Sequence, residues 1–110
     1  MHKIYIFDVD GTLTPSRRRM TEDFAKFFDK WSKDNIFYLV SGSDLEKMKE
    51  QVPKDILDLA EGLFTCGGNQ FWVDGKLQYE RQRPFRIRFY KVLGNRKKYK
   101  TIKIFRYYKR

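Results

Sequence analysis

Residues 3–14 read KIYIFDVDGTLT, and this stretch decides the fold. It begins as a nearly continuous apolar run, typical of a strand buried on both faces, and it ends in Asp8, Asp10 and a Gly-Thr turn. Residues i and i+2 of a strand point to the same side, so the two carboxylates are predicted to converge at the strand's carboxyl end. In parallel α/β sheets, ligands bind at that edge. Two carboxylates at that edge could bind Mg²⁺, or one of them could attack a phosphorus atom. A bare Asp-x-Asp is also typical of a turn that caps a strand.

Beyond residue 20, predicted helices and strands alternate along the chain. One helix begins after Thr21, which suits the N-cap, and ends at residues 34–35. A second begins at Ser43 or Asp44 and is stopped by Pro53. The other predicted elements are a helix over 55–60, strands over 3–8, 36–40 and 63–65, a turn over 67–69, and a hairpin in which Asp74-Gly75 joins strands 71–73 and 76–79.

Apolar residues at helical spacing predict which faces the three helices bury. The residues expected to point inward are Phe24, Phe27, Phe28 and Trp31 in the first helix, Leu45, Met48 and Val52 in the second, and Ile56, Leu57 and Leu59 in the third. The order strand, helix, strand, helix, strand predicts parallel strands joined by crossover helices. Residues 1–80 are therefore expected to form the first half of a doubly wound α/β fold.

A candidate phosphate site follows the second predicted strand. Ser41 ends that strand, and its hydroxyl is expected beside Asp8 if the two strands are neighbours. The backbone N–H groups of Gly42 and Ser43 open the next helix, where free donors and a partial positive charge favour anions. Simple helix capping by Ser43 is the alternative interpretation of the same residues.

Charge divides the chain at residue 80. Lys and Arg number 24 and Asp and Glu 14 in the whole sequence, which gives a net charge of +10. All of the acids lie between Asp8 and Glu80, whereas residues 81–110 carry thirteen Lys or Arg and no acid. We therefore expect two regions, 1–80 and 81–110, under different constraints. Strands are predicted over 83–90 and 100–108, joined by a turn near 93–98.

The basic region 81–110 leaves several functions open. Its cations, interleaved with tyrosines and phenylalanines, are typical of a segment that binds RNA or DNA. It could instead dock an acidic partner in a regulatory protein. A reading-frame shift or gene truncation after residue 79 would also explain the change in composition.

Other features bear on the cellular compartment. The sequence contains no run of about 18 apolar residues, so we expect no membrane span. The N-terminus lacks the apolar segment and cleavage site of a secretory signal. Cys66 is the one cysteine, so an internal disulfide is excluded. These observations favour a cytoplasmic protein. Nothing in the sequence indicates an oligomeric state.

The run from Asp8 to Thr14 closely resembles the first motif of the haloacid dehalogenase (HAD) superfamily, Asp-x-Asp-Gly-Thr-(Leu/Val)-Thr. The strand that ends in Ser41 resembles the second motif. The resemblance implies a Rossmann-like α/β core with a parallel sheet, in which Asp8 is the nucleophile that forms an aspartyl phosphate. It further implies that Asp10 is the general acid and base, and that Mg²⁺ is held by Asp8 and by Asp10, the latter through its backbone carbonyl. Ser41, Gly42 and Ser43 would hold the phosphoryl oxygens.

Further residues resemble the eukaryotic-type phosphomannomutase branch of that superfamily, over roughly residues 3–80. Thr14-Pro15-Ser16-Arg17 matches a segment whose arginine, here Arg17, contacts the sugar phosphate, although Arg17 is also typical of a solvated loop arginine. The segment 41–44 with Lys47 and Gln51, and Gly68-Asn69 with Asp74-Gly75-Lys76, resemble other family motifs. The chain departs from the family at Ser41, where Gly is frequent, and at Gly67, where the family has Glu.

The branch implies a phosphotransferase or phosphohydrolase that acts on a hexose phosphate. Two expected features are absent from this sequence: no acid follows Glu80 to form the fourth HAD motif, and no segment corresponds to a cap domain. The core is thus expected to be truncated, and the isolated chain to have weak or no mutase activity. A Mg²⁺ shell would need waters, another chain or Asp44 to be complete. The rival hypothesis is a non-catalytic nucleic-acid-binding or regulatory protein built on a HAD remnant.

Overall fold

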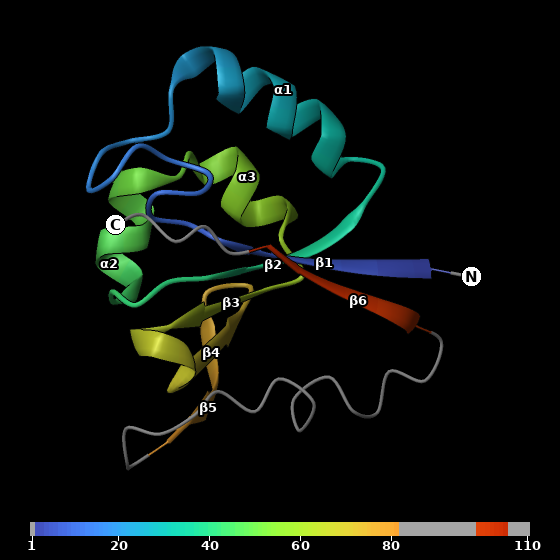
Figure 1. Ribbon diagram of the computed structural model, residues 1–110. Helices are drawn as coiled ribbons and strands as arrows, with labels where there is room; N and C mark the ends of the chain where they lie inside the picture. The colour runs from blue at the N-terminus through green and yellow to red at the C-terminus, as the bar shows by residue number, and fades with distance from the viewer. Residues whose placement is uncertain (1, 82–98, 106–110) are drawn as a thin grey trace.

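The computed structural model describes residues 2–81 and 99–105, and the strands in these ranges form one sheet (Figure 1). The sheet has six strands in the order β5-β4-β3-β2-β1-β6. Strands β1, β2, β3 and β6 are parallel, and the hairpin of β4 and β5 is antiparallel. The strands are β1 (His2–Asp8), β2 (Ile36–Val40), β3 (Gly62–Thr65), β4 (Gln70–Val73), β5 (Lys76–Glu80) and β6 (Tyr99–Phe105). The predicted parallel α/β arrangement is confirmed.

Three α-helices and one 3-10 turn connect these strands: α1 (Glu22–Ser32), α2 (Leu45–Gln51), α3 (Lys54–Leu59) and η1 (Cys66–Gly68). Their caps follow from local chemistry. The Thr21 hydroxyl accepts the N–H of Phe24 and caps α1, as predicted. Of the two residues proposed to cap α2, Asp44 does so, because its carboxylate accepts the N–H of Lys47 at 2.9 Å.

The three α-helices cover one face of the sheet. Phe28 of α1 is buried there among aromatic rings, edge-on to Phe7 and Phe37 and stacked on Trp31. Met48 and Val52 at α2 and Ile56 of α3 extend this cluster toward β3. Apolar surface buried here contributes most of the stabilisation of a fold of this size.

Two of the residues expected to point inward do not. Phe27 is 63% exposed and Leu59 is 36% exposed. Phe27 lies one helical step of about 100° from Phe28, so its ring falls at the edge of the buried stripe and contacts Phe24. Leu59 ends α3 on the solvent side. The buried face of these helices is therefore narrower than the face that the spacing of apolar residues predicted.

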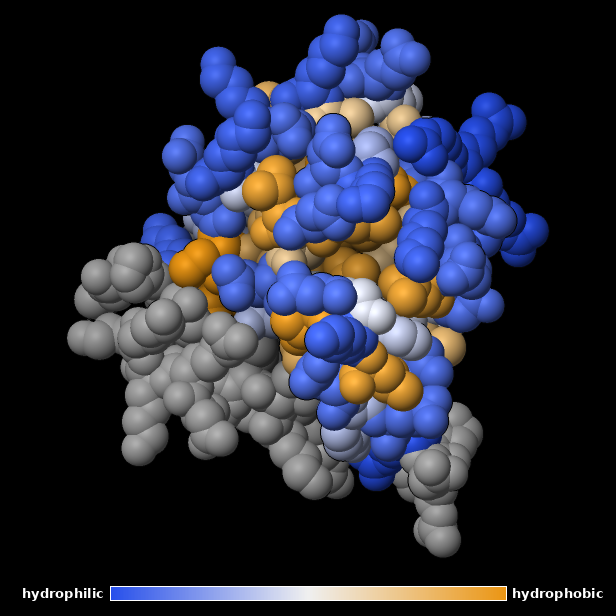
Figure 2. Space-filling model, turned by 180° about the vertical axis from the view of Figure 1, so that it is seen from behind, coloured by the Kyte–Doolittle hydropathy of each residue, from blue (hydrophilic) through white to orange (hydrophobic). Residues whose placement is uncertain are grey.

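The opposite face of the sheet is also apolar. Ile4 and Ile6 of β1, Tyr38 and Val40 of β2, and the rings of Phe64 and Phe71 form a second buried cluster there. None of the helices among residues 2–81 packs on this face, because α1, α2 and α3 all join the first cluster. Seen from behind, the whole molecule shows hydrophobic residues near the middle of its surface with hydrophilic residues around them (Figure 2).

The predicted hairpin is confirmed. Asp74 and Gly75 both have positive φ, 51° and 75°, which is the backbone of a type I′ turn. β6 lies where the sequence predicted a strand over 100–108, whereas the strand predicted over 83–90 and the turn near 93–98 lie outside the described residues. Within the described ranges, none of the helices has the length and hydrophobicity that crossing a membrane requires.

Candidate active site

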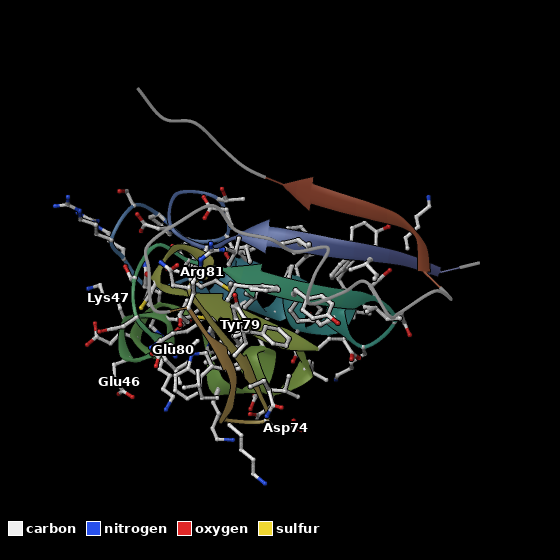
Figure 3. The ribbon with its side chains drawn as sticks, turned by 90° about the horizontal axis from the view of Figure 1, so that it is seen from below. Glu46, Lys47, Asp74, Tyr79, Glu80 and Arg81 are labelled. Carbon is white, nitrogen blue, oxygen red and sulfur yellow. The ribbon has the colours of Figure 1, made fainter. Side chains whose placement is uncertain are left out.

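The carboxyl ends of β1 and β2 lie side by side. Asp8 is in register with Val40, and the Val9 N–H donates to the Val40 carbonyl at 3.0 Å. The arrows of β1, β2 and β6 point to the same edge of the sheet, the edge near which Lys47 lies (Figure 3). β1 and β2 are therefore neighbours, which is the condition under which the Ser41 hydroxyl was expected beside Asp8, and this edge is where parallel sheets bind ligands.

A tight turn holds the Asp-x-Asp segment. Val9 is buried in the core between the two acids, and its carbonyl accepts the N–H groups of Thr12, Leu13 and Thr14 at 3.0–3.2 Å. Gly11 has φ +76°, a conformation that glycine adopts without strain. Asp8 therefore ends the strand, and Asp10 lies at the start of the turn.

Asp10 is fixed by two donors. The Arg17 backbone N–H lies 2.5 Å from Asp10 Oδ1, and the Gln51 side-chain nitrogen lies 2.9 Å from the same oxygen. The Arg17 N–H lowers the pKa of the Asp10 carboxyl below its usual 3.8; desolvation opposes this, and the Gln51 amide and the charges of Arg17 and Lys47 add to the lowering. The carboxylate form of Asp10 is therefore favoured in this conformation.

Arg17 contributes through its backbone as well as its charge. Its φ of 58° lies in the left-handed region, and this turns its N–H toward Asp10. The residue is exposed. The predicted substrate arginine thus lies beside Asp10.

The segment predicted to bind phosphate, residues 41–43, is hydrogen-bonded to the loop after β3. Ser41 is 1% exposed, and its oxygen accepts the Ser43 N–H at 3.0 Å. The carbonyls of Ser41 and Ser43 accept the N–H groups of Gly67 and Cys66. The Ser43 N–H is therefore engaged within the loop, whereas the Ser41 hydroxyl hydrogen can still be donated. A Cβ at Gly42 would meet nothing within 4 Å, so packing does not require glycine there.

α2 places two polar residues toward the Asp10 turn, Lys47 and Gln51, one helical turn apart. The positive charge of Lys47 helps to lower the pKa of Asp10, and the Lys47 nitrogen also pairs with a Glu50 carboxylate oxygen at 3.3 Å. Sequence reasoning connected Gln51 with this region through family resemblance alone. Its i,i+4 spacing from Lys47 is the signal that could have indicated a shared face.

The turn has the chemistry of a site for Mg²⁺, although no group of three His, Cys, Asp or Glu side chains gathers among the described residues. Mg²⁺ commonly takes one or two carboxylates and fills its other positions with water and substrate phosphate. None of the backbone hydrogen bonds described for the turn ends on the Asp10 carbonyl, so it can act as a ligand beside the Asp8 carboxylate. The Thr12 hydroxyl in the same turn is buried without a partner among the described residues, which a bound ligand or water would satisfy.

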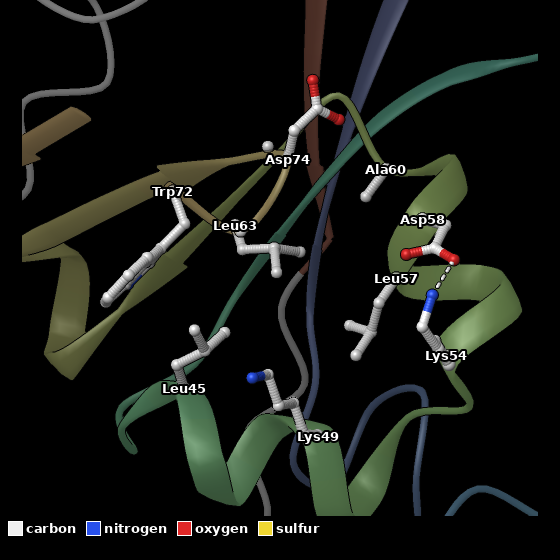
Figure 4. A pocket seen from close by; sticks show the side chains of 11 residues that line it. Leu45, Lys49, Lys54, Leu57, Asp58, Ala60, Leu63, Trp72 and Asp74 are labelled. Carbon is white, nitrogen blue, oxygen red and sulfur yellow. Dashed lines mark hydrogen bonds and ion pairs between the residues drawn. The ribbon is translucent and has the colours of Figure 1, made fainter. Parts of the chain in front are cut away.

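A separate groove of about 680 Å³ lies between α2, α3 and the β4–β5 hairpin (Figure 4). Leu45, Leu57 and Trp72 line it, and Lys49 extends toward the space between the two leucines. Lys54 and Asp58 pair at 2.6 Å at its side. The residues of the Asp10 turn do not line this groove.

Comparison with known proteins identifies the relatives of this chain, although no family model matches it. The sequence is 40% identical over 75 residues to the phosphomannomutase of Encephalitozoon cuniculi, which covers 68% of this chain and 29% of that protein. It is 37% identical over 73 residues to the phosphomannomutase of Saccharomyces cerevisiae, with 66% and 29% covered. The chain is homologous to part of the phosphomannomutases. It spans about 29% of the length of these relatives.

Solved structures support the same fold for the phosphomannomutase-like region. A trehalose-6-phosphate phosphatase related protein superposes with a TM-score of 0.59 at 19% identity, over 72% of this chain and 34% of that one. A HAD superfamily phosphatase from Bacteroides thetaiotaomicron gives a TM-score of 0.56 at 19% identity, over 73% and 30%. The described fold is thus similar to part of the fold of these proteins, one of them a HAD superfamily phosphatase, as the sequence motifs predicted.

Proposed function

We propose that this chain carries the nucleophile-bearing part of a phosphomannomutase-like phosphotransferase or phosphohydrolase that acts on a hexose phosphate. The observation that carries the proposal is the pair Asp8 and Asp10 at the carboxyl end of β1, in a chain homologous to phosphomannomutases. Its relatives are phosphomannomutases, and a HAD sugar phosphatase has a similar fold.

Asp8 and Asp10 share the covalent chemistry. A carboxylate oxygen of Asp8 attacks phosphorus, the bond from phosphorus to the ester oxygen breaks, and Asp10 gives a proton to the leaving oxygen. The aspartyl phosphate is then attacked by a sugar hydroxyl or by water, and Asp10 takes up the proton that the attacking group loses. The lowered pKa of Asp10 favours its carboxylate form, which suits this second step and disfavours the protonated form that the first step uses.

The other residues bind and orient. The Ser41 hydroxyl and the Gly42 N–H would donate to phosphoryl oxygens, with Ser43 holding the Ser41 side chain in place. Arg17 would contact the phosphate of the sugar. Mg²⁺, held by the Asp8 carboxylate and the Asp10 carbonyl, would neutralise charge on the phosphoryl oxygens when bound.

Phosphate release and phosphoryl-mimic binding test the proposal together. We expect the full chain with Mg²⁺ to release phosphate from mannose 6-phosphate or p-nitrophenyl phosphate slowly, and Asp8→Asn to release none above background. Beryllium fluoride should give a bound ¹⁹F signal with the wild-type chain and none with Asp8→Asn. Asp74→Asn is the matched control, because it removes an exposed carboxylate at a turn whose positive φ suits asparagine. Phosphate release and a fluoride signal that are the same in Asp8→Asn as in wild type would refute the proposal.

A second candidate function rests on composition. Residues 81–110 carry thirteen Lys or Arg and no acid, together with several aromatic residues. Such a segment would bind single-stranded nucleic acid through phosphate neutralisation and base stacking. Binding of a fluorescent oligonucleotide that weakens steeply with added salt would favour this function, and no binding at low salt would exclude it.

A further inference from the structure

Gln51, the last residue of α2, is a buried amide that reaches into the Asp10 turn. The residue is 2% exposed. Its side-chain nitrogen lies 2.9 Å from Asp10 Oδ1, 3.3 Å from the Arg18 carbonyl and 3.4 Å from the Thr14 hydroxyl. A carboxylate and a carbonyl can only accept hydrogen bonds, so the nitrogen of the amide faces them. Its carbonyl accepts the Met20 N–H at 2.8 Å, which fixes its main chain as well.

The two donors to Asp10 reach the same oxygen. The Arg17 N–H and the Gln51 nitrogen both contact Oδ1, and Oδ2 receives neither bond. The donors come from different elements, the loop after β1 and the end of α2, so the position of Oδ1 is fixed from two sides. Charge-assisted hydrogen bonds of this kind are roughly twice as strong as neutral ones.

We propose that Gln51 is a positioning residue that fixes the rotamer of the Asp10 carboxylate, so that Oδ2 remains the oxygen available for proton exchange with the substrate. This inference rests on the proposed function for its consequence in catalysis, but the hold on the carboxylate is a property of the folded chain alone. Without Gln51, the Arg17 N–H is the remaining anchor, and the carboxylate can turn about a single hydrogen bond. Misplacement of a reacting group by about 1 Å can slow a reaction roughly 100-fold.

The alternative is that Gln51 simply fastens α2 to the loop through Thr14 and Arg18. Two variants separate these roles. Gln51→Met keeps a side chain of similar length and removes the donor to Asp10. Thr14→Val removes another contact of the same nitrogen, together with the bond from the Thr14 hydroxyl to the Val9 carbonyl, and leaves the Asp10 bond in place, so it is the control for the spectra.

The backbone amide of Arg17 reports the orientation of the carboxylate. In ¹H–¹⁵N spectra of the full chain, we expect its proton signal downfield in wild type, because the N–H donates to a carboxylate. The signal should move upfield in Gln51→Met and stay in place in Thr14→Val. Equal positions in wild type and Gln51→Met would overturn the proposal. If Gln51→Met fails to fold, Asp10→Asn decides: the Gln51 side-chain amide signals must shift, and unchanged signals overturn the proposal.

Kinetics distinguish failure of this inference from failure of the proposed function. With p-nitrophenyl phosphate, kcat should fall roughly 10- to 100-fold in Gln51→Met with KM nearly unchanged, whereas Asp74→Asn, the control used for Asp8→Asn, keeps the wild-type kcat. Phosphate release as fast in Gln51→Met as in wild type would overturn the positioning role alone. If phosphate release by the wild-type chain does not depend on Asp8, the proposed function is overturned. The spectra then test separately whether Gln51 fixes the Asp10 carboxylate.

Discussion

Gly62 of β3 lies directly against the ring of Phe71 on β4: a Cβ at position 62 would lie 2.5 Å from Phe71 Cε1 and 3.1 Å from Tyr38 Cε2. Real Cβ atoms do not approach carbon as closely as 2.5 Å, so the ring of Phe71 would have to move, and the ring of Tyr38 would have to give by a few tenths of an ångström. We expect Gly62→Ala to destabilise the protein by about 1–3 kcal/mol, as overpacking of a core does. Urea denaturation followed by circular dichroism measures this. Gly42→Ala is the control, because nothing lies within 4 Å of its Cβ, and equal losses in both variants would contradict the explanation.

Neighbouring phenylalanines of α1 should respond in opposite ways. Phe28 is 3% exposed and contacts four aromatic rings, whereas Phe27 is 63% exposed. We expect Phe28→Ala to lower the free energy of unfolding by about 3–5 kcal/mol. Phe27→Ala should change it by less than about 0.5 kcal/mol. Chemical denaturation of the two variants provides the comparison, and a larger loss from Phe27→Ala would show that the face of α1 is assigned wrongly.

Asp10 should make the free energy of unfolding depend on pH in the acidic range. Its pKa in the folded chain is lower than the ordinary 3.8, mainly because of the Arg17 N–H, so the unfolded chain binds more protons between the two values. The stability that its charge contributes is complete above pH 3.8 and is lost as the pH falls through the folded pKa. Urea midpoints measured at about pH 6 and about pH 3 should therefore fall further for wild type than for Asp10→Asn. Identical falls would mean that this carboxylate is not held as described.

The backbone of Arg17 allows a test that does not depend on activity. Its φ of 58° is costly for a residue with a branched Cβ and easy for glycine. We expect Arg17→Val to be less stable than Arg17→Gly by about 1–2 kcal/mol. Thermal melting followed by circular dichroism compares the two. If Arg17→Val melts at or above the temperature of Arg17→Gly, position 17 does not hold the left-handed conformation.

Much of the fold follows from local chemistry that the sequence displays. The Thr21 cap, the Asp74-Gly75 turn and the apolar runs of β1 and β2 each specify an element without reference to the rest of the chain. The parallel pairing follows from the alternation of helices and strands. Local spacing does not distinguish Phe27 from Phe28, because the width of a buried stripe depends on which strand residues, here Tyr5, Phe7 and Phe37, lie beneath it.

The candidate site was predictable in its location but not in its connections. Asp8 and Asp10 mark the edge of the sheet because a strand leads directly into them. The bond from Gln51 to Asp10 spans 41 residues and depends on how α2 packs, which no local pattern encodes. The hydrogen bond from the Arg17 backbone to Asp10 could not be predicted either. An arginine in a polar loop suggests a function for its side chain, and the sequence does not show where its backbone N–H points.

The position of β6 beside β1 has a consequence for how the molecule is assembled during synthesis. β1 is made first, yet its partner on one side, Tyr99–Phe105, is translated more than ninety residues later. Until then, the strand that leads into Asp8 has one open row of backbone donors and acceptors. A nascent chain in that state presents a template for pairing with other chains, so the ribosome-bound protein should depend on chaperones until β6 emerges.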